Sequence, residues 1–228
     1  ALQQFRIVVI DLRGHGASDK PVHVSNYDHS KVWADDLHAV LKAKDLKRPL
    51  VVVWSYGGFI VSDYVREYGD ARLAGIVFVG AVTQLGTPDS KGHYGAGMKA
   101  LLGMLDPRQE INIASTAQFI RIAVAGPLSA EEYELILAYN MAVSPEIRSA
   151  LLARTVDGSD ALARIKVPVL IVQGEKDSIA LVAAADYIAA KIRHASKSFY
   201  PNAAHCPFME EPERFNRELA AMRIDIGP

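Results

Sequence analysis

The sequence has a single cysteine, Cys206, among its 228 residues. One cysteine excludes a disulfide bond within the chain and suits a reducing compartment, so we expect a cytoplasmic protein. The thiol lies next to His205, but no Cys-His-Asn order and no second cluster of metal-ligand residues surrounds it. We therefore interpret Cys206 as a small packing residue and expect neither a metal ion nor another cofactor.

An excess of charge and a long apolar run are also missing. Lys and Arg together number 25 and Asp and Glu 26, which gives a formal net charge of −1. This balance gives no electrostatic reason to expect nucleic acid or an anionic membrane as a partner. No run approaches the roughly 20 apolar residues that a membrane-spanning helix needs. Apolar residues nevertheless make up 50% of the chain, which is enough for a sizeable core.

One serine lies between a predicted strand and a predicted helix. Residues 50–54 form a continuous apolar run that is typical of a strand buried on both faces. Apolar residues then recur at helical spacing over 59–68, and Gly69 offers a C-terminal cap. This pattern places Ser55 in a tight turn above the sheet, at the N-terminus of the helix. The small residues Gly57 and Gly58 let the helix pack close to the strand.

The rest of the chain alternates between strands and helices, which indicates an α/β fold with a mainly parallel sheet flanked by helices. Further strands are predicted at 5–12, 73–79, 167–174 and 196–200, and further helices at 27–44, 181–192 and 212–222. Between two of the strands lies a block of successive helices, predicted at 98–105, 111–125, 131–142 and 146–156. We therefore expect a core of residues 1–86 and 166–228 with a helical insertion at 87–165.

Three polar residues follow separate strands at what should be one edge of the sheet: Ser55, Asp177 and His205. A serine hydroxyl is a poor nucleophile at neutral pH, so it needs a base within hydrogen-bonding reach and an acid behind that base. Each residue has an ordinary alternative. Ser55 would then be a plain turn residue, Asp177 a helix N-cap with Glu175 as the acid, and His205 a surface-loop histidine.

Four motifs resemble those of the α/β-hydrolase family. They are Trp-Ser-Tyr-Gly at 54–57, Asp-x-Arg-Gly-His-Gly-x-Ser-Asp-x-Pro at 11–21, Gly-x-x-Asp at 174–177, and Ala-His-x-Pro-Phe-x-Glu-x-Pro at 204–212. The resemblance implies a catalytic triad of Ser55, Asp177 and His205, with the backbone N–H of Tyr56 as an oxyanion donor. It also implies that the insertion is a cap over the site, and that His15 holds a loop in place.

The chain departs from the family pattern in two ways. Val53 replaces the first glycine of the serine turn, and we expect it to widen or strain that turn. The family also has three strands before the strand that here spans 5–12, and the third lies between that strand and the serine strand. Either 5–12 pairs directly with 50–53, or an N-terminal segment is absent. Without the family's His-Gly loop, a cap residue or a partner subunit would supply the second oxyanion donor, so a homo-oligomer is possible.

These features predict a serine hydrolase of small carboxylic esters, a carboxylesterase whose partner is a small-molecule ester. The resemblance extends to arylesterases, haloperoxidases and enol-lactonases. Two alternatives stay open. One is a non-catalytic ligand-binding protein of the same fold, suggested by Val53 and by the lack of an oxyanion loop. The other is a lyase or a perhydrolase that uses the same triad.

Overall fold

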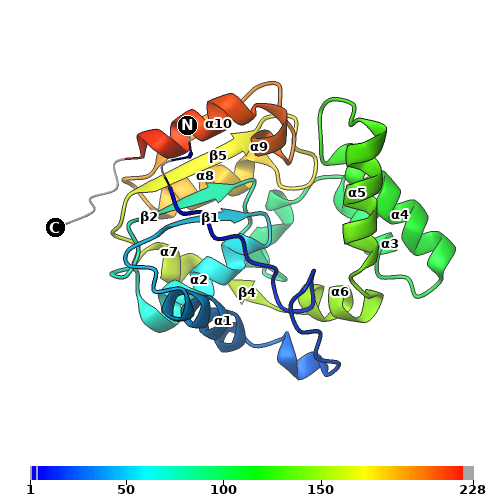
Figure 1. The fold of residues 1–228 in the computed structure, drawn as a ribbon, viewed down its shortest axis with the longest axis horizontal. Coiled ribbons are helices and arrows are strands. Elements are labelled where there is room, and N and C mark those ends of the chain that lie inside the picture. Colours follow the sequence, from blue (N-terminus) through cyan, green and yellow to red (C-terminus); the bar gives the residue numbers. More distant parts are fainter. Residues whose placement is uncertain (1, 4, 223–228) are drawn as a thin grey trace.

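A four-stranded parallel sheet forms the centre of the computed structural model, which describes residues 2–3 and 5–222 (Figure 1). Its strands are β1 (Leu50–Trp54), β2 (Gly75–Val79), β5 (Val169–Gly174) and β6 (Ser196–Tyr200), in the order β1-β2-β5-β6. In the register, Val77 lies opposite Val52 on one side and Leu170 on the other. The predicted mainly parallel sheet is confirmed.

Helices cover both faces of the sheet because successive side chains of a strand point to opposite faces. Ile76 and Phe78 of β2 face a core cluster that contains side chains from four helices. These helices are α1 (Ser30–Ala43), α2 (Gly57–Tyr68), α7 (Ser159–Leu162) and α8 (Val182–Lys191). Val77 and Val79 face the second cluster, to which α10 (Pro212–Ala221) contributes Phe215 and Leu219. The short helix α9 (Pro207–Glu210) precedes α10.

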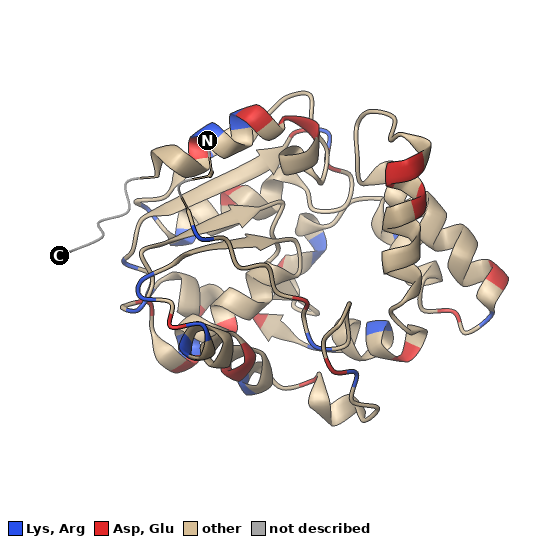
Figure 2. Cartoon of the chain, viewed as in Figure 1, with Lys and Arg blue, Asp and Glu red and all other residues tan. Residues whose placement is uncertain are grey.

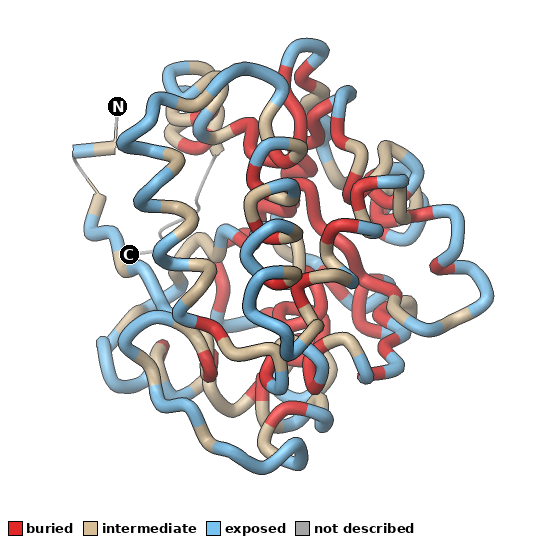
Figure 3. The backbone as a smooth tube through the Cα atoms, turned by 90° about the vertical axis from the view of Figure 1, so that its right-hand side faces the viewer, coloured by how far each residue is buried: buried red, intermediate tan, exposed pale blue. Residues whose placement is uncertain are grey.

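Between β2 and β5 the chain forms the helical insertion on one side of the sheet (Figure 1). Its helices are α3 (Met98–Gly103), α4 (Gln109–Ile122), α5 (Ala130–Met141) and α6 (Pro145–Leu152). Ser129 and Glu132 form a capping box that starts α5, and Ser144 caps α6 ahead of a proline. None of the twelve residues of α5 is buried. In Figure 3 the buried stretches lie mostly behind the helices nearest to the viewer.

A short antiparallel ribbon joins the two ends of the insertion. Its strands are β3 (Gln84–Leu85) and β4 (Val156–Asp157). Elsewhere in the chain, two 3-10 helices span Val24–Asn26 and Asp89–His93. The sequence pattern does not predict the ribbon, because two residues are too few to show an alternating pattern. After β4, helix α7 buries Ala161 and Leu162 in the main core. A separate cap over 87–165 stays a prediction.

Residues 5–12 form no strand, so the predicted strand is wrong. The segment runs past β1 (dark blue in Figure 1), but the hydrogen-bonded ladder of the sheet starts at β1 itself. Both segments line one cavity, and Val9 is 89% exposed. A β-branched pattern shows that a segment can pair, but pairing also needs a neighbouring strand about 4.8 Å away. Direct pairing of 5–12 with 50–53, one of the two alternatives, is therefore not observed.

Charges of both signs are mixed over the helices and loops (Figure 2). This distribution agrees with the nearly neutral composition. Among the described residues, no helix combines the length and the apolar character that a membrane crossing requires.

Candidate active site

Ser55 lies in the sharp turn that the sequence predicts between β1 and α2. Its φ is +50°, a left-handed conformation that is uncommon for a residue other than glycine. The backbone N–H of Ser55 donates to the carbonyl of Val79 over 3.0 Å, and its own carbonyl accepts from Gly58 over 3.0 Å. A Cβ atom at position 58 would collide with the carbonyl oxygen of Val82. The glycine therefore allows the first turn of α2 to approach the chain after β2.

Val53 does not open this turn. It is buried in the main core, and a Cβ atom at position 57 would lie 3.0 Å from Cβ of Val53. The valine is accommodated because Gly57 has no side chain at that point. With the hydrogen bonds of Ser55 in place, the widening expected from the missing first glycine is not observed.

Asp177 and His205 are hydrogen-bonded to each other below the surface. Oδ2 of Asp177 lies 2.7 Å from Nδ1 of His205, and the two side chains are 0% and 1% exposed. Oδ1 of Asp177 accepts from the backbone N–H groups of Ile179 and Ala180, at 2.8 and 3.0 Å. These bonds fix the carboxylate, which leaves Oδ2 to orient the imidazole. Glu175, the alternative acid, is exposed.

Two glycines make room for this pair. The sequence marks Gly174 only as the start of the Gly-x-x-Asp motif, and it does not mark Gly80. At Gly80, which follows β2 with a φ of +47°, a Cβ atom would lie 3.2 Å from Nδ1 of His205 and 3.4 Å from Oδ2 of Asp177. At Gly174 a Cβ atom would overlap the carbonyl of Ala204. The available signal for Gly80 was its place directly after the predicted strand 73–79, at the carboxyl edge of the sheet.

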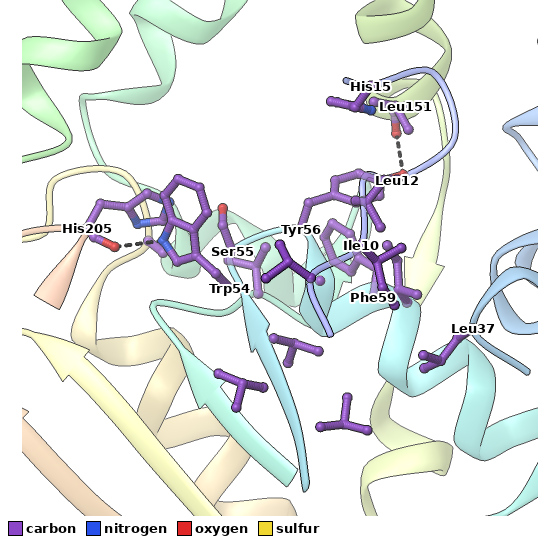
Figure 4. A pocket seen from close by; sticks show the side chains of 18 of the residues that line it. Ile10, Leu12, His15, Leu37, Trp54, Ser55, Tyr56, Phe59, Leu151 and His205 are labelled. Atoms are coloured by element: carbon purple, nitrogen blue, oxygen red, sulfur yellow. Dashed lines mark hydrogen bonds between the residues drawn. The ribbon is translucent and has the colours of Figure 1, made fainter. Parts of the chain in front are cut away.

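The backbone of His205 is held from two further directions. Nε1 of Trp54 donates to the carbonyl of His205 over 2.7 Å, and the two rings lie 5.2 Å apart (Figure 4). The N–H of His205 donates to the carbonyl of Ala123, directly after α4 of the insertion, over 3.0 Å. Trp54 is the first residue of the Trp-Ser-Tyr-Gly motif, but nothing in that motif indicates that its indole reaches His205.

Ser55 and His205 line the same cavity, which has a volume of about 990 Å³ (Figure 4). No hydrogen bond joins the two side chains, and Nε2 of His205 is buried without a partner among the described residues. In a ligand-free site such a bond is often long, and it tightens only when substrate binds. The structure thus brings His205 and Asp177 into contact and places Ser55 beside the same cavity.

Tyr56, the proposed oxyanion donor, is fixed by its side chain. Its hydroxyl donates to the carbonyl of Leu151 over 3.2 Å (Figure 4), and burial raises the pKa of its phenol to about 12. The ring makes edge contacts with Trp33 and Phe59. No described residue accepts a hydrogen bond from the backbone N–H of Tyr56, so this donor at the start of α2 is free for a ligand.

The surroundings of His15 and Cys206 agree with structural roles for these two residues. Nδ1 of His15 lies 3.1 Å from the carbonyl of Arg13, which agrees with a role in holding its loop. Cys206 is buried, and burial raises the pKa of its thiol to about 12, which leaves it largely protonated at neutral pH. The described residues contain no group of three or more His, Cys, Asp or Glu side chains that could hold a metal ion.

Known proteins with similar sequences and structures are hydrolases and peroxidases. The AB hydrolase superfamily protein YisY of Bacillus subtilis is 28% identical over 222 residues, which cover 95% of this chain and 80% of that protein. The bifunctional esterase/perhydrolase DCH of Acinetobacter calcoaceticus is 26% identical over 230 residues, with coverages of 95% and 81%. The crystal structure of the esterase RhEst1 from a Rhodococcus species superposes with a TM-score of 0.88 at 32% identity, over 95% of this chain and 79% of that one.

The sequence model of the alpha/beta hydrolase family matches residues 1–218. This match covers the serine turn and the positions of Asp177 and His205, and it agrees with the parallel sheet and its flanking helices. The chain belongs to the alpha/beta hydrolase family.

Proposed function

We propose that this protein is a serine hydrolase of small carboxylic esters. The observation that carries the proposal is the 2.7 Å bond between Asp177 and His205, because it leaves Nε2 of His205 available beside the cavity that Ser55 also lines. The esterases among the related proteins support the same reaction class.

In the proposed reaction, Nε2 of His205 takes the proton of the Ser55 hydroxyl as Oγ attacks the ester carbonyl. Asp177 holds the ring with Nδ1 protonated and stabilises the imidazolium that forms. The backbone N–H of Tyr56 binds the oxyanion, assisted by its position at the N-terminus of α2. Collapse of the intermediate releases the alcohol, which takes its proton from His205, and leaves an acyl group on Ser55. Water activated by His205 then hydrolyses this acyl-enzyme.

Perhydrolysis is a second candidate function. An acyl group on Ser55 can be attacked by hydrogen peroxide instead of water, which yields a peracid and the free serine. The reason to consider it is that one related protein is an esterase/perhydrolase and others are non-heme haloperoxidases. Peroxide-dependent bromination of monochlorodimedone in the presence of acetate and bromide would detect the peracid, because the peracid oxidises bromide to the brominating species.

Labelling by a fluorophosphonate probe tests the proposed function, because only an activated serine reacts with it. We expect one covalent adduct on Ser55, hydrolysis of p-nitrophenyl butyrate by the unmodified protein, and loss of both in Ser55→Ala. The matched control is Ser62→Ala, which removes a buried hydroxyl of α2 that, among the described residues, bonds only to the carbonyl of Gly58. A folded protein that takes up no probe would instead be a non-catalytic member of the family. Undiminished turnover by Ser55→Ala would remove Ser55 from the mechanism.

A further inference from the structure

Arg148 is a partly buried cation without an acidic partner. It lies on α6, where Nη2 donates to the carbonyl of Asn140 over 2.5 Å and Nε reaches the carbonyl of Val143 at 3.4 Å. No carboxylate among the described residues lies within 4.0 Å of its guanidinium. Burial lowers the pKa of Arg148 to about 10, because nothing nearby compensates the desolvated charge. A positive charge in such surroundings favours an anion.

The two hydrogen bonds to main-chain carbonyls use only part of the hydrogen-bonding capacity of the Arg148 guanidinium. Asn140 lies near the C-terminus of α5 and Val143 just after it, where a cation commonly satisfies the free carbonyls of a helix. A guanidinium has five N–H donors in a planar fork, however, and this role uses Nε and one N–H of Nη2. Nη1 makes no hydrogen bond with the described residues, and it is not among the fully enclosed unpaired atoms. Its donors are therefore accessible.

Arg148 lines the cavity that contains Ser55 and His205, and the charges on the walls of this cavity have one sign. The lining includes no Asp or Glu from the described residues. Its arginine and histidine side chains are Arg6, His15, Arg48, Arg148 and His205. Most of the remaining wall is aliphatic or aromatic. Such a cavity suits a ligand with an apolar body and an anionic end.

The position of Arg148 on α6 relates it to the reacting serine. Arg148 and Leu151 are three residues apart and so are neighbours on the surface of α6. The carbonyl of Leu151 accepts a hydrogen bond from the hydroxyl of Tyr56, the residue that directly follows Ser55. His15, whose pKa is lowered by burial and also by the charge of Arg148, lies with Leu151 across the site from His205 in Figure 4. The cation thus belongs to the wall opposite the base.

We propose that Arg148 binds a carboxylate on the substrate, so that the preferred substrates are carboxylic esters with an apolar chain that ends in a carboxylate. This inference rests on the proposed ester hydrolysis and specifies its substrate class. The carboxylate lies on either the acyl or the alcohol part of the ester. A guanidinium holds it through two parallel N–H bonds, which a lysine ammonium at the same position reproduces only in charge.

The test compares anionic esters with neutral esters of similar length in a pH-stat at pH 7.5. Monomethyl adipate against methyl hexanoate places the carboxylate on the acyl part, and 5-acetoxypentanoate against pentyl acetate places it on the alcohol part. We expect the wild-type protein to favour the anionic member of at least one pair in kcat/KM by about tenfold or more, as for one charge-assisted hydrogen bond. The pair that shows the preference identifies the part that carries the carboxylate.

Variants at position 148 connect that preference to the guanidinium. In Arg148→Gln the ratio of kcat/KM for the anionic to the neutral ester should fall by about tenfold, and in Arg148→Lys it should fall less. The matched control is Arg217→Gln, which changes an exposed arginine of α10 and should leave the ratio as it is. If Arg148→Gln does not fold, inhibition of the wild-type protein decides, because hexanoate, which has a terminal carboxylate, should then inhibit more strongly than the neutral hexanamide.

Two outcomes would overturn the inference: no preference for either anionic ester by the wild-type protein, or an unchanged ratio in Arg148→Gln. Failure of the proposed function looks different, because then neither neutral nor anionic esters are hydrolysed and the fluorophosphonate leaves Ser55 unlabelled. Hydrolysis of methyl hexanoate and pentyl acetate without any anionic preference rejects only the role of Arg148.

Discussion

Nη2 of Arg154 lies 2.5 Å from Oδ2 of Asp63, and the two side chains are 1% and 0% exposed. Asp63 belongs to α2, two turns after Ser55, and Arg154 lies between α6 and β4. Nη1 of Arg154 also lies 3.2 Å from the hydroxyl of Tyr56. A buried ion pair therefore joins the end of the helical insertion to the helix that starts at the serine turn.

Breaking this pair should cost considerable stability. Arg154→Met leaves the buried Asp63 with Arg66, 3.1 Å away, as its remaining ion-pair partner. We therefore expect the free energy of unfolding in urea to fall by somewhat less than the ~3–5 kcal/mol that an uncompensated buried charge costs. Changing both residues to apolar ones, as in Arg154→Met with Asp63→Leu, should cost less than Arg154→Met alone. Asp186→Asn serves as the matched control, because its pair with Lys197 is about half exposed and should contribute less than about 1 kcal/mol. Equal losses of stability in Arg154→Met and in Asp186→Asn would contradict the prediction.

Gly80→Ala should impair catalysis more than stability. The added methyl group would press against Nδ1 of His205 and Oδ2 of Asp177 at 3.2 and 3.4 Å, and so displace the imidazole. We expect kcat for p-nitrophenyl butyrate to fall by about a hundredfold, as for a displacement of about 1 Å in a catalytic group. The control Gly69→Ala also has a positive φ, of +69°, but no described atom outside its two chain neighbours lies within 4 Å of its new methyl group. It should lose stability and retain kcat.

Trp54→Phe tests whether the indole positions His205, the proposed base. Phenylalanine keeps the aromatic packing against His205 but cannot donate to its carbonyl. We expect about tenfold slower inactivation by the fluorophosphonate, with a loss of stability of about 1 kcal/mol. Tyr68→Phe is the comparison, since it removes a hydroxyl that bonds to Asp35 on the surface. If the inactivation rate is unchanged, the indole only fills space.

Stability should decrease as the pH is lowered from about 7 to 5. Burial lowers the pKa values of His15 and His93 in the folded protein. The unfolded chain therefore binds more protons than the folded one below the ordinary histidine pKa of about 6.5, and this difference favours unfolding. Urea titrations at pH 7 and pH 5 measure the change, and His93→Gln should reduce it. A free energy of unfolding that rises on acidification would contradict the assignment of both shifts.

The sequence predicts the sheet and the positions of Ser55, Asp177 and His205 because parallel strands end at one edge, where short motifs mark their turns. It does not predict the parts that depend on approach between distant segments. The indole of Trp54 reaches a carbonyl 151 residues away, and the role of Gly80 comes from the space that His205 occupies. The pattern of residues 5–12 has the same limit, because it shows a tendency to pair but does not identify a partner strand.

The bond from the N–H of His205 to the carbonyl of Ala123 has a consequence for exchanging the insertion between family members. The loop that carries His205, the proposed base, is supported by a main-chain atom of the helical insertion, which we propose also encloses the substrate. A transplanted insertion must therefore supply a carbonyl at this point in addition to a suitable binding surface. A chimaera without it would acquire new substrate contacts but lose part of the support for its imidazole.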